Sequence, residues 1–176
     1  MQRLLVLPRH RALTTAAHPR AGTLLVRDVL KRKERSRWTC EASVTVFDAT
    51  KKMVLENVGS LVVTRHGKVV GIITERDYLR KVVHAGKSSA TTPVSDIATM
   101  GADALVVASL DDTIQDTLDA MASKDVRHLP VADAKGEVVG LLSIREVAKA
   151  LAKERDNAFR MLDQIQTESK LPIHDG

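Results

Sequence analysis

Aromatic residues are nearly missing from this sequence of 176 residues, which has one Trp, one Tyr and two Phe. This scarcity argues against a nucleic-acid binder that stacks bases on aromatic rings. A single cysteine, Cys40, excludes an internal disulfide and a cysteine-built metal site, and we expect it to be a small buried apolar side chain. The six histidines show no metal-ligand spacing, and there is no Walker-type or GxGxxG loop. The sequence therefore predicts no enzyme, no metal site and no covalent cofactor.

Acidic residues are also missing from the start of the chain, where the first one is Asp28. Residues 1–37 carry ten Lys or Arg against two acids, whereas residues 38–176 carry seventeen against twenty. An Arg-rich, acid-free start is typical of an organelle-targeting presequence. We therefore predict a targeting-like basic arm over 1–23 and a mitochondrial location on the matrix side, with a plastid or the cytoplasm as alternatives. The alternative for the arm itself is a disordered tail or a docking segment. The apolar run 4–7 is too short for a membrane span.

An internal repeat is the main feature that is present. When the sequence is shifted by 68, matching residues fall into register, and one extra residue in the second half then makes the shift 69. The residues Val26, Asp28, Val29, Thr45, Val46, Asp48 and Met53 meet Val94, Asp96, Ile97, Thr113, Ile114, Asp116 and Met121. Farther on, GIITERD (71–77) overlays GLLSIRE (140–146). The order of these matches indicates a duplicated unit.

Each unit shows the same pattern of elements. Thr45 or Thr113 precedes a helical pattern, and two short apolar runs follow, 60–64 with 69–74 and 129–132 with 138–143. A second helix should begin near Glu75 or Ile144. Because a lone unit of about sixty residues would expose its sheet, the two should pack about a pseudo-twofold axis. The polar stretch 86–93 reads as the linker.

The lines VGSLVV…GKVVGIITERDYLRKVV and VRHLPVADAKGEVVGLLSIREVAKAL together resemble the two halves of a CBS-domain pair, also called a Bateman module. The resemblance covers about residues 24–151 and is closest to plant-type proteins with one such pair, some of them organellar. It implies an α/β (α+β) fold of two tandem β-α-β-β-α units with a basic N-terminal arm and an extended C-terminal helix. The predicted divisions are 1–23, 24–85, 86–93, 94–151 and 152–176.

Two strand-to-helix junctions, 74–77 and 143–146, are candidate binding motifs. Free N–H groups at a helix start favour an anion, the hydroxyl adds a donor, and the Asp77 carboxylate could accept two ribose hydroxyl protons. The alternative is a capping box, which needs no ligand. In families that resemble this one, the Asp holds the ribose and the Ser or Thr lies near the phosphate. Glu146 departs from that Asp, which puts ribose binding at the second motif in doubt.

The other candidate is the strand start 126–130. Pro130 suggests an edge or a bulge that leaves backbone groups free for an adenine edge. Arg127 could pair with phosphate, and His128 would add positive charge below about pH 6.5. The alternative is that both are ordinary polar surface residues at a strand start. The equivalent residues in the first unit are Gly59 and Ser60, so we expect two clefts with complementary defects. The predicted nucleotide-binding residues are Gly59, Ser60, Thr74, Arg76, Asp77, Val126, Arg127, His128, Pro130, Ser143 and Glu146.

These patterns predict a non-catalytic regulatory module that binds an adenine nucleotide (AMP, ADP or ATP) between its CBS motifs and transmits this to a protein partner. The resemblance implies a homodimer, or a subunit of a larger complex with a thioredoxin-system or respiratory partner. One alternative is an accessory subunit of a mitochondrial respiratory assembly that keeps the fold without needing ligand. Another is a nucleic-acid-associated protein that uses its basic arm, against which the acidic body argues.

The stretch from Arg145 to about residue 166 keeps helical spacing beyond what the second unit needs. It should either offer a surface to a second copy or another protein, or fold back over the first unit.

Overall fold

The structure is a computed structural model that describes residues 23–30, 35–101 and 104–168. The predicted basic arm lies outside these residues except for Thr23, so it stays a prediction. Repeat 1 (24–85) contains α1 (Val26–Val29), the 3-10 turn η1 (Arg35–Trp38), β1 (Thr39–Glu41), α2 (Val46–Glu56), β2 (Ser60–Arg65), β3 (Lys68–Thr74), α3 (Glu75–Tyr78) and the π-helical turn η2 (Leu79–Val83). Repeat 2 (94–151) and its extension contain the 3-10 turn η3 (Val94–Asp96), β4 (Thr99–Met100), α4 (Ile114–Ser123), β5 (His128–Ala132), β6 (Val138–Ser143) and α5 (Ile144–Glu168).

The first helix of each repeat begins where the sequence predicts it. Thr45 caps α2 by accepting the Asp48 N–H at 3.1 Å, and Thr113 caps α4 by accepting the Asp116 N–H at 3.0 Å. A threonine hydroxyl satisfies one of the backbone donors that a helix start leaves unpaired. One apolar face of each helix then packs on the sheet of a repeat, and Met53 of α2 is 3% exposed.

A β-hairpin follows that helix in both repeats. β2 pairs with β3 and β5 with β6, both antiparallel, and each hairpin carries one bulge. His66 and Gly67 turn the first hairpin with positive φ angles of 52° and 77°, a conformation in which glycine has no steric cost. β1 adds parallel to β2 and β4 antiparallel to β3, which gives one sheet of order β1-β2-β3-β4. The counterpart of β1 in repeat 2 is a single parallel bridge between Ala108 and Val131.

The two repeats exchange their leading segments, a feature that the sequence did not reveal. The Val26 N–H donates to Asp112 O at 2.9 Å, and the equivalent Val94 N–H donates to Val44 O at 2.9 Å. Val26 is therefore buried in the core of repeat 2, whereas Val94 is buried in the core of repeat 1. Each core therefore contains a segment from the other half. The predicted division of the chain at the linker 86–93 stays a prediction.

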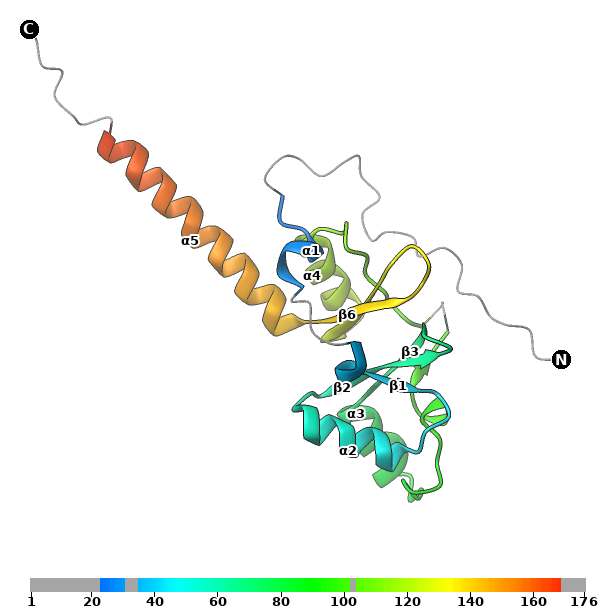
Figure 1. The fold of residues 1–176 in the computed structure, drawn as a ribbon. Coiled ribbons are helices and arrows are strands. Elements are labelled where there is room, and N and C mark those ends of the chain that lie inside the picture. The colour runs from blue at the N-terminus through cyan, green and yellow to red at the C-terminus, as the bar shows by residue number, and fades with distance from the viewer. Residues whose placement is uncertain (1–22, 31–34, 102–103, 169–176) are drawn as a thin grey trace, which may run out of the picture.

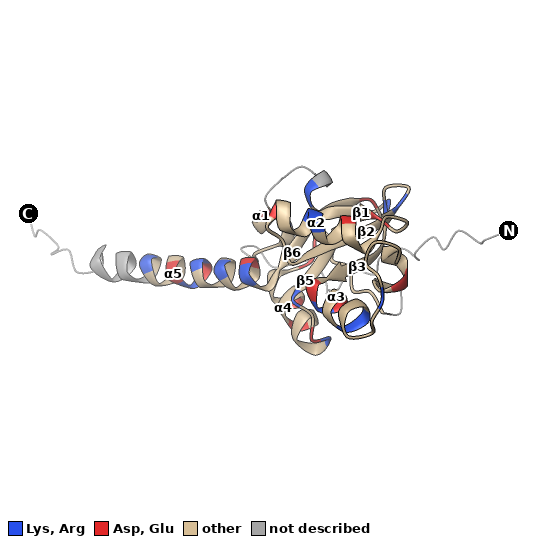
Figure 2. Cartoon of the chain, turned by 90° about the horizontal axis from the view of Figure 1, so that it is seen from below, with Lys and Arg blue, Asp and Glu red and all other residues tan. Residues whose placement is uncertain are grey.

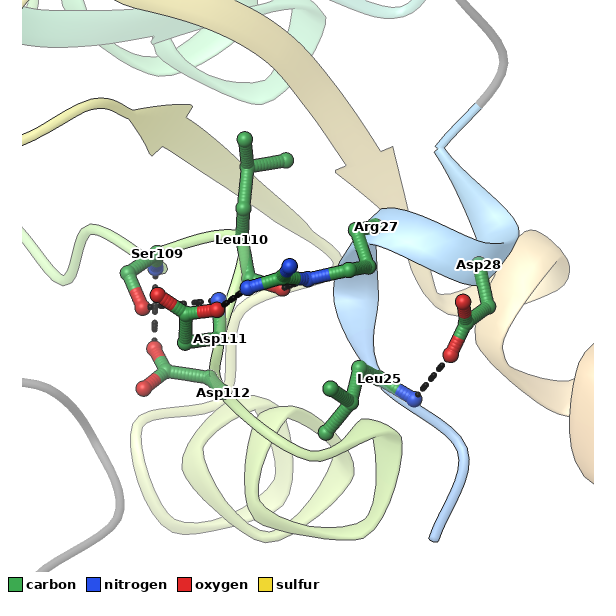
Figure 3. A network of polar contacts seen from close by, with 7 residues as sticks. All are labelled: Leu25, Arg27, Asp28, Ser109, Leu110, Asp111 and Asp112. Carbon is green, nitrogen blue, oxygen red and sulfur yellow. Dashed lines mark hydrogen bonds and ion pairs between the residues drawn. The ribbon is translucent and has the colours of Figure 1, made fainter. Parts of the chain in front are cut away.

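Side chains fix the first of these exchanged segments. Arg27 of α1 forms an ion pair with Asp111 and donates from Nε to Leu110 O at 3.4 Å (Figure 3). On the loop that it reaches, the Ser109 N–H donates to the Asp112 carboxylate at 2.9 Å. The segment before β1 is thus attached to the loop before α4, which supports the pseudo-twofold relation between the repeats.

An apolar layer joins the two sheets. Val62, Val69 and Ile72 of repeat 1 are buried in one cluster with Leu105, Val107, Ala132 and Val138 of repeat 2. The Val69 N–H also donates to Gly136 O at 3.1 Å, so the hairpins are hydrogen-bonded to each other. The sheets therefore meet along their hairpins, and the strand ends at 74 and 143 lie at the margin of this layer.

Helix α5 leaves the body of the molecule after its first turns (Figure 1). Val147 is fully buried and Leu151 is half-buried, but every side chain from 152 to 161 is exposed. Acidic and basic residues alternate along the projecting part (Figure 2). The alternative that this helix folds back over repeat 1 is wrong, because residues 152–161 are exposed and α5 leads away from α2 and α3 (Figure 1). No helix in the described part of the chain is long and apolar enough to cross a membrane.

Candidate functional site

A cavity of about 750 Å³ lies at the margin between the repeats. All of the residues predicted from the sequence line it, and they come from both repeats: Gly59, Ser60, Thr74, Arg76, Asp77, Val126, Arg127, His128, Pro130, Ser143 and Glu146. Its volume falls in the range of small-molecule sites, which is roughly 300–1,000 Å³. The sequence suggested two clefts, one for each motif; in the structure the two motifs line one continuous space.

The first motif forms a complete capping box at the start of α3. The Asp77 Oδ2 accepts the Thr74 N–H at 3.0 Å and the Thr74 hydroxyl at 2.7 Å, while that hydroxyl accepts the Asp77 N–H at 3.2 Å. The other carboxylate oxygen, Oδ1, pairs with Lys81 Nζ at 2.8 Å. The Asp77 carboxylate therefore has partners on both oxygens before any ligand enters.

The second motif forms the same box with a longer acid. The Glu146 Oε2 accepts the Ser143 N–H at 3.0 Å and the Ser143 hydroxyl at 2.8 Å, and that hydroxyl accepts the Glu146 N–H at 3.3 Å. Glu is a usual third residue in such boxes, so the departure from Asp keeps the local geometry. The capping-box alternative thus describes both motifs, but it leaves Glu146 Oε1 without a partner among the described residues.

The two helix starts are joined to the strand starts beside them. The Glu75 N–H donates to Gly59 O at 3.1 Å, and the equivalent Ile144 N–H donates to Arg127 O at 2.9 Å. Across the repeats, Arg76 Nη1 lies 3.6 Å from the Asp125 carboxylate. Each helix start is therefore hydrogen-bonded to the strand start beside it, and an exposed ion pair links the two repeats at the cavity.

His128 is half-buried in this wall, and its charge differs from the sequence expectation. Burial lowers the pKa of His128 and the neighbouring Arg127 lowers it further, while Glu146 and Glu75 act in the opposite direction. The imidazole therefore stays neutral to a lower pH than the expected value of about 6.5. At neutral pH it is a hydrogen-bonding group of the cavity, and Arg127 supplies the positive charge.

Pro130 lies in a strand beside a bulge, as predicted, but its backbone carbonyl is already bonded. It lies within β5, paired with Leu141, and a bulge follows it between Val131 and Ala132. Its carbonyl accepts the Ala108 N–H at 2.8 Å. The expectation that this backbone is left free for an adenine edge is therefore wrong for the Pro130 carbonyl, because the segment at 108 already uses it.

Ser60 is the polar group that stands out. Its side chain is fully buried, it lines the cavity, and its Oγ is the buried side-chain nitrogen or oxygen atom without a hydrogen-bond partner in the described part of the chain. A buried hydroxyl without a partner costs about 1–3 kcal/mol. The Ser60 hydroxyl is therefore the buried polar atom of this wall that is left for a further hydrogen bond.

Three further lining or supporting residues were missed by the sequence analysis. Trp38, the one tryptophan of the chain, is 7% exposed and lines the cavity, as does Leu105. Lys81 reaches Asp77 from the following turn. The rarity of tryptophan was a signal for Trp38, but nothing in the sequence places η1 beside the motifs.

Cys40, by contrast, lies in β1 on the sheet of repeat 1 and is half-buried. Burial raises the pKa of its thiol to about 11, against a lowering by Lys52. A thiol with such a pKa is protonated at neutral pH and is a poor nucleophile. Within the described residues no group of three or more His, Cys, Asp or Glu side chains could hold a metal ion.

The CBS domain family model matches residues 26–84 and again 91–153. The chain belongs to the CBS domain family. It is similar to the CBS domain-containing protein CBSX3, mitochondrial, of Arabidopsis thaliana, with 37% identity over 145 residues that cover 78% of this chain and 69% of that protein. These matches confirm the tandem CBS fold predicted from the repeat.

Two solved structures share the fold. The crystal structure of CBS domain NE2398 is 35% identical, with a TM-score of 0.64, and the match covers 73% of this chain and 97% of that one. The CBS domain pair of protein MJ0100, solved in complex with 5′-methylthioadenosine and S-adenosyl-L-methionine, is 22% identical, with a TM-score of 0.64. That match covers 75% of this chain and 98% of the MJ0100 chain. At 22% identity the likeness is one of fold.

Proposed function

We propose that this CBS pair is a non-catalytic regulatory module that binds an adenine nucleotide (AMP, ADP or ATP) in the cavity between its repeats and transmits binding to a protein partner. The observation that carries the proposal is a cavity of about 750 Å³ whose wall holds polar groups from both repeats, among them Asp77, Arg127 and Glu146. The complex of the MJ0100 pair with two adenosine compounds supports the ligand class.

The chemistry of the wall fits such a ligand. Trp38 and Leu105 supply apolar surface for a base, Ser60 supplies a hydroxyl for a ring nitrogen, and Arg127 supplies a fork of donors for phosphate. Because residues of both repeats touch the same space, a ligand that contacts both changes their relative orientation when it prefers one arrangement.

Trp38 makes the proposal directly testable, because tryptophan fluorescence of this chain reports on the cavity alone. Titration of the full chain with AMP, ADP and ATP should give a saturable change with at least one of them, and calorimetry should give the same affinity. Absence of both heat and fluorescence change with all three would overturn the proposal.

Ser60→Ala separates a ligand role from a structural one. Removing a buried hydroxyl without a partner should leave the free protein as stable or slightly more stable, while nucleotide affinity falls about fivefold to tenfold, the value of one ordinary hydrogen bond. Urea denaturation and the fluorescence titration measure the two effects. A variant that is less stable and binds equally well would assign Ser60 to the fold.

The partner that we propose is a second copy of the chain, which would place the module in a homodimer. Five large apolar side chains are exposed on α2 and η2 of repeat 1, and the equivalent positions of repeat 2 hold smaller or polar side chains. Asp48 and Lys51 are both exposed on α2, so this face carries both charges, as a self-complementary twofold contact needs. As a further partner we propose a thioredoxin-system or respiratory protein, which the resemblance in sequence implies. We also propose a mitochondrial location, which the name of the similar CBSX3 protein supports.

An accessory subunit of a mitochondrial respiratory assembly is the second candidate function. The observation that favours it is the Asp77 carboxylate, which is bonded on both oxygens without any ligand. If this function is correct, Asp77→Ala should leave a stable co-purifying complex intact, and the chain should bind none of the three nucleotides.

A further inference from the structure

The two acids of the motifs differ in how much of each carboxylate is left for a ligand. A carboxylate offers about four acceptor positions, two on each oxygen. The capping boxes use two positions on Asp77 Oδ2 and two on Glu146 Oε2. What distinguishes the two motifs is therefore the second oxygen of each acid.

Lys81 occupies that second oxygen in repeat 1. Its ammonium lies 2.8 Å from Asp77 Oδ1 and also donates to Ile97 O at 2.5 Å, so it is held from both sides. At the equivalent position of repeat 2 stands Ala150, which has no group that could reach Glu146. Asp77 keeps one acceptor position, whereas Glu146 Oε1 keeps two among the described residues. The two adjacent hydroxyls of a ribose need two.

The arginine side chains in the two halves of the cavity also differ in whether they already have a partner. Arg76, in the first motif, is already paired with Asp125 at 3.6 Å. Arg127 lines the cavity and forms no side-chain hydrogen bond or ion pair with another described residue, and its equivalent in repeat 1 is Gly59. A phosphate therefore finds an unpaired guanidinium, that of Arg127, in repeat 2, whereas the guanidinium of Arg76 in repeat 1 already has a carboxylate partner.

We propose that the repeat 2 half of the cavity, formed around Arg127, Ser143 and Glu146, binds the ribose diol and the phosphate. In the repeat 1 half, Lys81 keeps the ribose from Asp77, because it already occupies Asp77 Oδ1. One nucleotide then binds per chain. This rests on the proposed function, and it reverses the expectation from sequence that Asp77 is the competent acid and Glu146 the defective one.

Calorimetry of the full chain with AMP tests this assignment. Glu146→Gln keeps the capping box, because Gln serves there as well as Glu, but removes the charge that the diol needs. Its affinity for AMP should fall about 10- to 100-fold, the range for a hydrogen bond to a charged group. Asp77→Asn should weaken binding less than Glu146→Gln does. Lys81→Met should add a second, weaker binding event. Lys87→Met, an exposed lysine in the segment 86–93 that lines neither the cavity nor the proposed dimer face, is the control that should add none.

The outcomes separate the two proposals. If Asp77→Asn weakens AMP binding more than Glu146→Gln, or if Lys81→Met still binds one AMP per chain, the assignment of the half-sites is overturned while nucleotide binding stands. If the unmodified chain binds no nucleotide, the proposed function itself fails. Adenosine in place of AMP tests the phosphate contact, because Arg127→Gln should weaken AMP binding and leave adenosine binding unchanged.

Discussion

At the scale of single residues, the protonation of His128 depends on its burial and on its neighbours in the cavity wall. Its imidazole lies among Arg127, Glu146 and Glu75, and burial together with Arg127 lowers its pKa. The folded state binds a proton at His128 less readily than the unfolded chain does. Below about pH 6.5, the ordinary pKa of histidine, the unfolded chain therefore binds more protons than the folded state. His128 therefore contributes stability near pH 7 that is lost as the pH falls below the unfolded value.

Urea denaturation at about pH 7.5 and about pH 5.5 measures this effect. The free energy of unfolding should decrease between the two values in the unmodified chain and decrease less in His128→Gln. His66→Gln, at an exposed position in the turn of the first hairpin, is the matched control and should keep the full decrease. Equal decreases in all three proteins would contradict the assignment of a lowered pKa to His128.

Residue identities predicted part of the site well. The hydroxyl-to-acid spacing at 74–77 and 143–146 predicted both the helix starts and the place of the cavity, because a strand that ends and a helix that begins leave donors at one point. The analysis of the sequence missed the ion pair between Asp77 and Lys81, although an acid four residues before a lysine on a helix is a signal for such a pair. No spacing along the chain could show that the Ser60 hydroxyl is left without a partner, because that depends on packing between segments far apart in the chain.

At the scale of elements, the helices of the two repeats provide an internal comparison. Repeat 1 exposes Phe47, Val54 and Leu55 on α2 and Leu79 and Val83 on η2. The equivalent positions of repeat 2, all exposed, are Gln115, Ala122, Ser123, Ala148 and Ala152. Since the two repeats share one fold, the fold itself does not require large apolar side chains at these positions. An interface explains why they are present in repeat 1.

This comparison gives a matched pair of variants for the homodimer. The unmodified chain should have a two-chain mass in sedimentation or light scattering at micromolar concentration. Leu79→Glu places a charge in the apolar face of repeat 1 and should give single chains, whereas Ala148→Glu, at the equivalent position of repeat 2, should keep the two-chain mass. A single-chain mass for the unmodified protein, or dissociation by Ala148→Glu alone, would contradict the assignment of this face.

At the scale of the whole molecule, the repeat in the sequence predicted two similar units and their hairpins, and the family match confirms the tandem CBS fold. It did not predict that α1 packs on repeat 2 while η3 packs on repeat 1. The apolar pattern of the sequence indicates that Val26 and Val94 are buried. It does not indicate which core each one enters, because both cores accept the same residue type. Through this exchange each half contributes a segment to the core of the other, and both halves line the shared cavity.

The central claim is that this shared cavity holds a nucleotide. A crystal structure of the full chain grown with saturating AMP tests it most directly. The account predicts one AMP per chain, with its base beside Trp38 and Ser60 and its ribose on Glu146. A cavity that contains only water at saturating AMP would contradict it.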